Sequence, residues 1–283
     1  MNALGPIEVL FLLAPLAVVP MALRLAPRTG ERGGKARAAA RRLQPWAAVA
    51  VVGSFLARRG PVAASLAAPW LLLTLLVALH GWGRLRRDLR TAAELAIDAG
   101  CLMLPIGGGW LILSRLGATP LGFEEPVILL TAVHFHYAAF GSLVLTGMAG
   151  RAAGDGRLVR LITAGAIAAP PLLAAGITMS PSLELLAATI LALSLSGLAV
   201  LTLVGIAPRL PGAARILLSL SSASLLGGMA CALAYAVGEF TGIGLISLGQ
   251  MARIHGPLNG LGFVLGGLLG WTLVPRNLRP ETL

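Results

Sequence analysis

Two histidines and a tyrosine occur within a single helical turn, in the run His134-Phe135-His136-Tyr137. The run lies inside an apolar stretch, where an ionisable side chain costs about 2.5 to 3.5 kcal/mol to insert and therefore needs a partner or a role. Residues two apart on a helix point about 200° apart, so a regular helix cannot aim both imidazoles at one metal ion. His134 and Tyr137 are three apart and are expected to share a face. The run is interpreted either as a proton-transfer pair that lines a cavity or as two interhelical hydrogen bonds that lock a bundle.

A second polar motif opens the last apolar stretch, in the run Arg253-Ile254-His255-Gly256-Pro257-Leu258-Asn259. His255 and Asn259 are four apart and are expected to lie on one helical face. Pro257 lacks an N–H, so it frees a backbone carbonyl, as often happens where a membrane helix lines a cavity. The alternative interpretation is an ordinary helix start with polar residues at the membrane interface.

Carboxylates and a further tyrosine fall near these motifs. Glu124 and Glu125 precede the stretch that holds the histidines, and Tyr235 and Glu239 lie four apart at the end of another. Carboxylates beside imidazoles provide the acid and the base that proton transfer requires. We expect these groups to converge in the outer half of a helix bundle: Glu124, Glu125, His134, His136, Tyr137, Tyr235, Glu239, His255 and Asn259. The alternative for Glu124, Glu125 and Glu239 is that they are solvated loop charges.

The opposite half of the bundle contains three ionisable residues, His80, Glu94 and Asp98. Glu94 is expected to pair with Arg90. Asp98 lies deeper, roughly 9 to 10 Å into its helix, and no basic residue four positions away can neutralise it. It is therefore expected either to pair with His80 or to become protonated through burial, and it is kept as a candidate site residue.

Long apolar stretches dominate the elements that must position these groups. Of 283 residues, 57% are hydrophobic and only 12% are charged. A bilayer core takes roughly 20 helical residues to cross, and long apolar runs favour helices over a membrane β-barrel. The sequence therefore predicts an all-α, polytopic transmembrane helix bundle, with the glycines of the last stretch as close packing surfaces. Its nine expected spans are 5–24, 44–57, 61–82, 92–115, 126–149, 157–179, 182–205, 213–238 and 253–274.

Arg58, Arg59, Gly60 and Pro61 divide the short second span from the third, so residues 44–82 are either two spans or a re-entrant hairpin. Lys and Arg number 18 in one set of alternate connections and 4 in the other. Positive residues stay in the cytoplasm, so the N-terminus is expected outside and the C-terminus inside. The chain is expected to be one transmembrane domain over 1–283, with a basic cytoplasmic loop near 25–43 along the anionic leaflet.

Several classes of function do not fit these patterns. The net charge is +11, but the basic residues lie between apolar runs, whereas a nucleic-acid-binding protein gathers them on one soluble face. Cys101 and Cys231 lie in apolar stretches and form no metal or redox motif. We expect no metal and no cofactor, although a haem between His134 or His136 and a histidine of another helix is geometrically allowed.

The two motifs, Val133 to Ala138 and Arg253 to Phe263, resemble those of the YndJ-like family of bacterial membrane proteins. The resemblance implies a location in the bacterial inner (cytoplasmic) membrane. It also implies that His134, His136, Tyr137, His255 and Asn259 belong to one site, but it supplies no reaction.

Three functions are weighed. The leading one is an integral membrane enzyme that performs acid/base chemistry (isomerisation, cyclisation or hydration) on a lipophilic, isoprenoid-like small molecule. In it, His134 and His136 donate and accept the proton, and Tyr137, His255 and Asn259 orient the substrate. The second is a proton-coupled transporter that uses the same residues with Asp98. The third is a structural membrane protein whose polar residues hold helices together.

Overall fold

The computed structural model describes residues 4–26, 34–86, 91–275 and 278, and in this part of the chain every regular element is helical. Each of the nine expected spans corresponds to one uninterrupted helical run, so the predicted all-α fold is confirmed. Several runs change from α-helix to π-helix along their length. The first four runs are Pro6–Leu25, made of α1 (Pro6–Leu13), η1 (Ala14–Val18) and α2 (Val19–Leu25), then α3 (Lys35–Leu56), α4 (Pro61–Leu85) and α5 (Ala92–Leu116).

The remaining five runs follow a short turn, η2 (Pro120–Gly122). They are Val127–Ala153, made of α6 (Val127–His134), η3 (Phe135–Gly141) and α7 (Ser142–Ala153); α8 (Arg157–Met179); Pro181–Arg209, made of α9 (Pro181–Val200), η4 (Leu201–Ile206) and η5 (Ala207–Arg209); α10 (Gly212–Thr241); and 248–272, made of α11 (Leu248–Pro257), η6 (Leu258–Leu265) and α12 (Gly266–Thr272).

Seven of these runs are long and apolar enough to cross a membrane, and α3 and the run over 248–272 are not among them. The start of α3 differs from the expectation, because the helix begins at Lys35 and not at residue 44. Residues 35–43 are rich in alanine, arginine and lysine, which favour helix, so the basic segment continues the helix instead of forming a loop. The rest of the expected basic loop, at 27–33, lies outside the described residues.

The contacts of the chain define two compact units. Unit 1 comprises Met1–Leu89 and Ile97–Gly141, and unit 2 comprises Arg90–Ala96 and Ser142–Leu283. Each unit is described by itself. The expectation of a single domain stays a prediction.

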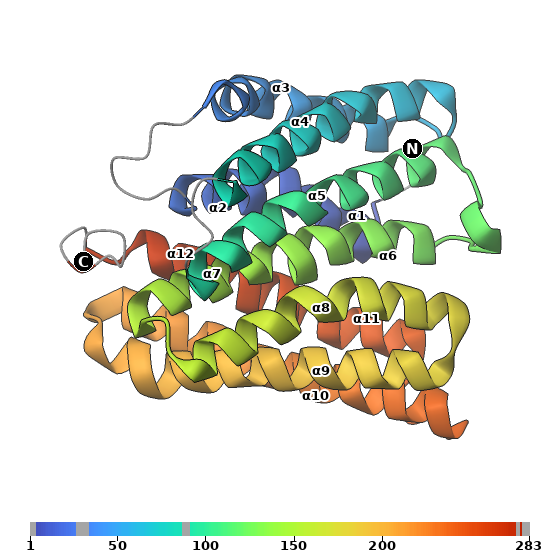
Figure 1. The fold of residues 1–283 in the computed structure, drawn as a ribbon. Helices are drawn as coiled ribbons and strands as arrows, with labels where there is room; N and C mark the ends of the chain where they lie inside the picture. Colours follow the sequence, from blue (N-terminus) through green and yellow to red (C-terminus); the bar gives the residue numbers. More distant parts are fainter. Residues whose placement is uncertain (1–3, 27–33, 87–90, 276–277, 279–283) are drawn as a thin grey trace. The chain divides into compact units, whose positions relative to one another are not determined.

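In unit 1, α3 and α4 form a helical hairpin and lie side by side in Figure 1. The turn between them requires glycine at Gly60, whose φ of 145° is in the region that side chains disfavour. Pro61 then begins α4, where its missing N–H costs nothing. The four-residue divider seen in the sequence is therefore the turn of this hairpin.

Arg115 of α5 fastens this hairpin. Its buried guanidinium donates Nη2 to the carbonyls of Ser54 and Ala57 at 2.9 and 3.0 Å, at the C-terminal end of α3. The last carbonyls of a helix lack partners within the helix and carry partial negative charge, so a cation suits them. The guanidinium also lies 4.7 Å from the Phe55 ring centroid.

In unit 2, α8, α9 and α10 pack in sequence, with α8 and α9 side by side in Figure 1, and α10 contacts α11, η6 and α12. Glycines of the last run allow it to approach α10 closely, as the glycine-rich sequence predicted. A side chain at Gly262 would overlap Ser224, and a Cβ at Gly270 would lie 2.9 Å from Leu218. These glycines let side chains of α10 pack directly against the backbone of the last run.

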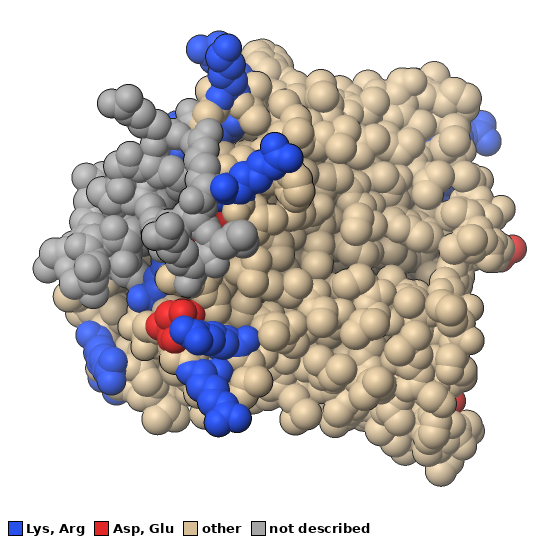
Figure 2. Space-filling model, in the orientation of Figure 1, with Lys and Arg blue, Asp and Glu red and all other residues tan. Residues whose placement is uncertain are grey.

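Basic side chains gather at one end of unit 2. Arg157 begins α8, Arg209 ends η5 and Arg215 lies in the first turn of α10, and in Figure 2 basic side chains lie at the left-hand end of α8 and α9. Asp155, between α7 and α8, accepts hydrogen bonds from the Ala92 N–H and from Arg160, and these lower the pKa of its carboxyl, the Ala92 bond most.

Replacement of Arg115 by methionine should lower the free energy of unfolding by about 2 to 3 kcal/mol, because two helix-end carbonyls lose their donor. Arg115→Lys keeps the charge but not the fork of donors, so its free energy of unfolding should lie between those of the unaltered protein and Arg115→Met. Arg58→Met, an exposed neighbour of the same turn, is the control. Equal losses in Arg58→Met and Arg115→Met, measured by denaturant unfolding in detergent, would contradict the fastening role.

Candidate functional sites

His136 lies in the core of unit 1, at the start of the π-helix η3. Its side chain is 0% exposed, its Nδ1 is 2.8 Å from the Ala132 carbonyl oxygen, and its Nε2 is 2.9 Å from Trp70 Nε1. The indole N–H can only donate, so Nε2 is the acceptor and the imidazole proton is on Nδ1. Both ring nitrogens are therefore engaged, and the imidazole links η3 to α4.

Aromatic and backbone contacts close the space around this imidazole. The Phe11 ring meets it edge-on, with centroids 5.0 Å apart. Gly107 of α5 also packs against the ring, and a Cβ there would lie 2.7 Å from His136 Nδ1. The imidazole thus contacts α1, α4 and α5 together, and its environment is a packed core.

Tyr137, the next residue, joins η3 to the first helical run. Its buried hydroxyl donates to the Leu10 carbonyl at 2.7 Å. In an α-helix this carbonyl would accept from the N–H of residue 14, but the Ala14 N–H bonds to the Phe11 carbonyl instead. The Tyr137 hydroxyl supplies a donor to the Leu10 carbonyl.

His134 has different surroundings. It is exposed, and its Nδ1 is 3.0 Å from the Leu130 carbonyl of its own helix. The expected shared face with Tyr137 is not seen, since Tyr137 is buried. The π-helix that begins at Phe135 has more residues per turn than an α-helix, so a spacing of three no longer returns to the same face.

Asp98 pairs with a residue of the neighbouring helix. Its buried carboxylate lies 2.5 Å from Arg84 Nε of α4. Gly81, one turn before Arg84, allows this approach, because a Cβ there would lie 3.1 Å from the Asp98 carbonyl oxygen. The sequence interpretation considered partners on the same helix and His80, and it missed this ion pair across the two helices.

Glu94 is likewise engaged across helices. In unit 2 it accepts two hydrogen bonds from Arg151 of α7, at 2.7 and 2.9 Å, and both side chains are buried. The expected partner Arg90 lies outside the described residues. A bidentate pair of this kind has defined geometry and is stronger than a single contact.

Glu124 and Glu125, which precede the helix that holds the two histidines, have different environments. Glu125 accepts hydrogen bonds from the Ser114 hydroxyl at 2.5 Å and from the Leu129 N–H at 3.2 Å, so it caps α6 and ties it to α5. Arg59 is 3.6 Å from the same carboxylate. Glu124 is exposed, as the solvated interpretation expects.

His255 and Asn259 come together in unit 2, where α11 passes into the π-helix η6. The Asn259 amide nitrogen lies 3.0 Å from His255 Nδ1 and donates to the His255 carbonyl at 3.1 Å. His255 Nδ1 is also 2.9 Å from the Gly228 carbonyl of α10. Gly228 makes the contact feasible, because a Cβ there would overlap the Asn259 amide. The expected pairing of these two residues on one face is therefore present.

The Asn259 side chain is incompletely satisfied. Its Oδ1 is buried and has no hydrogen-bond partner within the described residues. A buried acceptor without a donor costs about 1 to 3 kcal/mol. This atom can therefore accept a hydrogen bond from a donor outside the described residues.

Glu239 and Tyr235 form a third group, with a residue that the sequence interpretation missed. The Glu239 carboxylate interacts repulsively with that of Glu184, in the first turn of α9, and the Tyr235 hydroxyl lies near both. Glu184 sits beside the end of α10 because consecutive antiparallel helices bring the start of one to the end of the next, and that rule would have found it. Gly228 and Glu239 are eleven residues apart on α10, roughly 16 Å, so this group is separate from the His255–Asn259 pair.

The candidate residues thus divide between the units. His134, His136, Tyr137 and Asp98 belong to unit 1, and Glu239, His255 and Asn259 belong to unit 2. Their convergence on one site stays a prediction. In the described residues, no three His, Cys, Asp or Glu side chains are grouped to hold a metal ion.

Comparison with known proteins identifies the family of this chain. The model of the family described as YndJ-like protein matches residues 9–263, a range that contains both polar motifs. The chain belongs to the YndJ-like family. It is 32% identical over 206 residues to the uncharacterized membrane protein YndJ of Bacillus subtilis (strain 168), an alignment that covers 72% of this chain.

The resemblance read from the two motifs is therefore confirmed, and the chain is a membrane protein. The match covers 37% of the length of the Bacillus YndJ protein. No solved structure matches the chain.

Proposed function

We propose that this YndJ-like chain is a membrane-embedded helical module whose buried polar residues fasten its helices to one another. The observation that carries the proposal is the state of His136. It is fully buried, both of its ring nitrogens have partners, and the partners belong to two different helical runs. A proton-transfer residue needs a nitrogen that can reach its substrate, and here both nitrogens are occupied.

The other buried polar residues of the described chain support the same role. Tyr137 bonds to the first run, Asp98 pairs with α4, and Glu94 pairs with α7. Hydrocarbon offers no hydrogen bonds to a polar side chain, so contacts between helices satisfy these groups and hold the bundle together.

The His136–Trp70 bond tests this role through a double-mutant cycle with Trp70→Phe and His136→Leu. The coupling free energy should be about 0.6 to 2 kcal/mol, the range for hydrogen bonds between membrane helices. Trp82→Phe, on the same helix but 45% exposed, should leave stability unchanged. Unfolding free energies in detergent give the result, and zero coupling would reject a fastening role for His136.

We also propose that the chain lies in the bacterial cytoplasmic membrane with its N-terminus outside and its C-terminus inside. The excess of Lys and Arg in alternate connections supports this orientation. The relative from Bacillus subtilis, which is described as a membrane protein, supports the location.

Cysteine labelling tests the orientation. In a chain without native cysteines, Gly244→Cys, between α10 and α11, should react with a membrane-impermeant maleimide in intact cells. Ala153→Cys, at the end of α7, should react only after the cells are opened. Both positions are exposed. The reverse labelling pattern would show that the orientation is opposite to the one proposed, and it would leave the fastening proposal intact.

A second candidate function, acid/base chemistry on a lipophilic isoprenoid-like molecule, is favoured by the surroundings of His255. When Nδ1–H donates to the Gly228 carbonyl, the Asn259 amide nitrogen donates only to the His255 carbonyl, and Nε2 is the basic nitrogen of this imidazole. The buried Oδ1 of Asn259, one turn away, accepts no bond from the described chain and suits a substrate hydroxyl. Isomerisation, cyclisation and hydration all require such a group to move a proton. The transporter alternative gains less, because Asp98 is already paired with Arg84.

His255→Gln separates these possibilities, because the amide can still donate to Gly228 but is no base. If the second candidate holds, turnover of a lipid extract by purified protein should fall by about 100-fold or more, with the melting temperature retained. Arg253→Gln, an exposed change on the same helix, should keep full turnover. Equal turnover in His255→Gln and the unaltered protein would end the enzyme candidate, whereas proton flux in liposomes without turnover would favour transport.

A further inference from the structure

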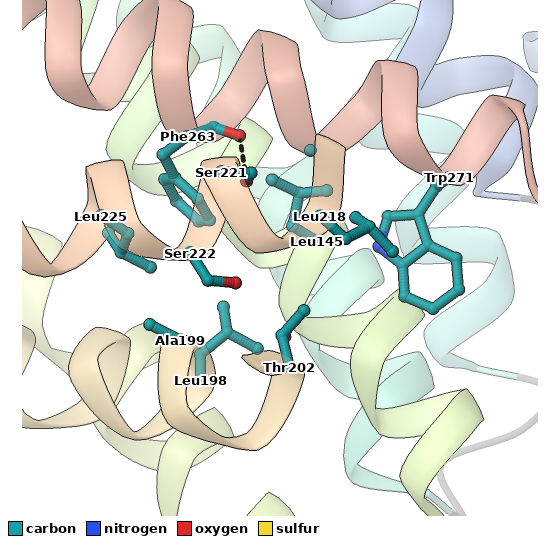
Figure 3. A pocket seen from close by; sticks show the side chains of 11 residues that line it. Leu145, Leu198, Ala199, Thr202, Leu218, Ser221, Ser222, Leu225, Phe263 and Trp271 are labelled. Atoms are coloured by element: carbon teal, nitrogen blue, oxygen red, sulfur yellow. Dashed lines mark hydrogen bonds between the residues drawn. The ribbon is translucent and has the colours of Figure 1, made fainter. Parts of the chain in front are cut away.

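A small crevice lies within unit 2, and none of the candidate residues above lines it. Its volume is about 10 Å³, and it is lined by residues of α7, of α9 with η4, of α10, and of η6 with α12 (Figure 3). Most of its wall is apolar and includes Leu145, Leu225 and Trp271. Three hydroxyl groups interrupt this wall, those of Thr202, Ser221 and Ser222. Polar groups in so apolar a wall need partners.

Only one of the three hydroxyls has a partner in the described chain. Ser221 donates to the Phe263 carbonyl at 2.8 Å, the bond drawn in Figure 3. The residues Ser222 and Thr202 are 3% and 7% exposed; their hydroxyl oxygens keep accessible surface at the crevice and hydrogen-bond to no described residue. In Figure 3 the Ser222 hydroxyl points into the opening, on the side where Thr202 lies. Serine and threonine in a helix commonly bond back to the preceding turn, so two hydroxyls that do not are notable.

Two π-helical segments meet at this crevice. Thr202 belongs to η4 and Phe263 to η6. A π-helical turn displaces carbonyls from the regular α-helical ladder, and such turns are frequent at functional sites. The local backbone therefore adds irregular polar surface to a wall whose side chains are mainly apolar.

Size and charge select the ligand. A cavity of about 10 to 15 Å³ holds one water, which needs two to four polar partners. Thr202, Ser222 and the lone pairs of Ser221 provide up to three. None of the lining residues is charged, so a bare cation would lack a counter-charge in a medium of low dielectric constant. A lipophilic molecule is too large.

We propose that this crevice is a binding site for a single water molecule, held by the Thr202 and Ser222 hydroxyls between η4, α10 and η6. The water hydrogen-bonds to two hydroxyls that face the crevice, where η4 and η6 depart from α-helical geometry. It makes this junction of unit 2 a hydrated one, in contrast to the packed surroundings of His136 in unit 1.

Radiolytic hydroxyl-radical labelling in detergent tests the proposal, since a bound water is a local source of radicals. Phe263 and Trp271 line the crevice and are 5% and 2% exposed, so bulk solvent hardly reaches them. They should be labelled more than Trp70, which is 0% exposed and bonded to His136. In the double variant Thr202→Val, Ser222→Ala, their labelling should fall to the level of Trp70.

Two matched variants control the test. Thr163→Val removes another buried hydroxyl without a partner, on α8 of the same unit but outside the crevice, and should leave the labelling unchanged. Thr202→Ser keeps the hydroxyl and should retain the labelling even if the double variant fails to fold. Labelling of Phe263 and Trp271 no higher than that of Trp70, or equal in the double variant and the unaltered protein, would overturn the proposal. Labelling suppressed by Na⁺ but not by choline would also overturn it, because the occupant would then be a cation.

Discussion

The hydrocarbon interior of a membrane supplies no hydrogen bonds, so each polar group placed there must find its partner within the protein. This constraint explains the positions of the conspicuous side chains of this chain. His136 and Trp70 satisfy each other, and the Tyr137 hydroxyl donates to the Leu10 carbonyl, whose regular helical donor, the Ala14 N–H, bonds to Phe11. Each contact joins segments far apart in the sequence. Two of the residues whose types suggest chemistry, His136 and Tyr137, thus also join helices of unit 1.

The buried ion pairs follow the same constraint at a greater cost. Taking two charges out of water is expensive, and their attraction repays the cost only with good geometry. Asp98 and Glu94 lie one turn apart on α5, and each has an arginine on another helix. Loss of one partner would leave an unpaired charge, which is worse than having neither. Such pairs therefore specify which helices pack together more than they add to stability.

Much of this fold was accessible from the sequence, because hydropathy and length mark helices that must cross hydrocarbon. Every expected span matches a helix, and the turn at Gly60 was recognised from its residues. The start of α3 was not, because a basic segment can continue a helix beyond its apolar part. Arg84 and Arg151 were not identified as partners of Asp98 and Glu94, since each lies on another helix at a position that no sequence spacing marks. The π-helix that separates His134 from Tyr137 leaves no periodic signal.

Satisfaction of polar groups offers a way to distinguish fastening residues from ligand-binding ones. His136 has a partner at each nitrogen, whereas Asn259 Oδ1 is buried with none in the described chain, and the hydroxyls of Thr202 and Ser222 face a crevice. A buried group without a partner destabilises the fold unless something outside the chain completes it. In the tandem-histidine motif, both ring nitrogens of His136 already have partners within unit 1. Among the described residues, buried polar atoms without a partner occur in both units, Arg115 Nε in unit 1 and Thr163 Oγ1 and Asn259 Oδ1 in unit 2, so the places where a ligand or solvent has something to bind are not confined to one unit.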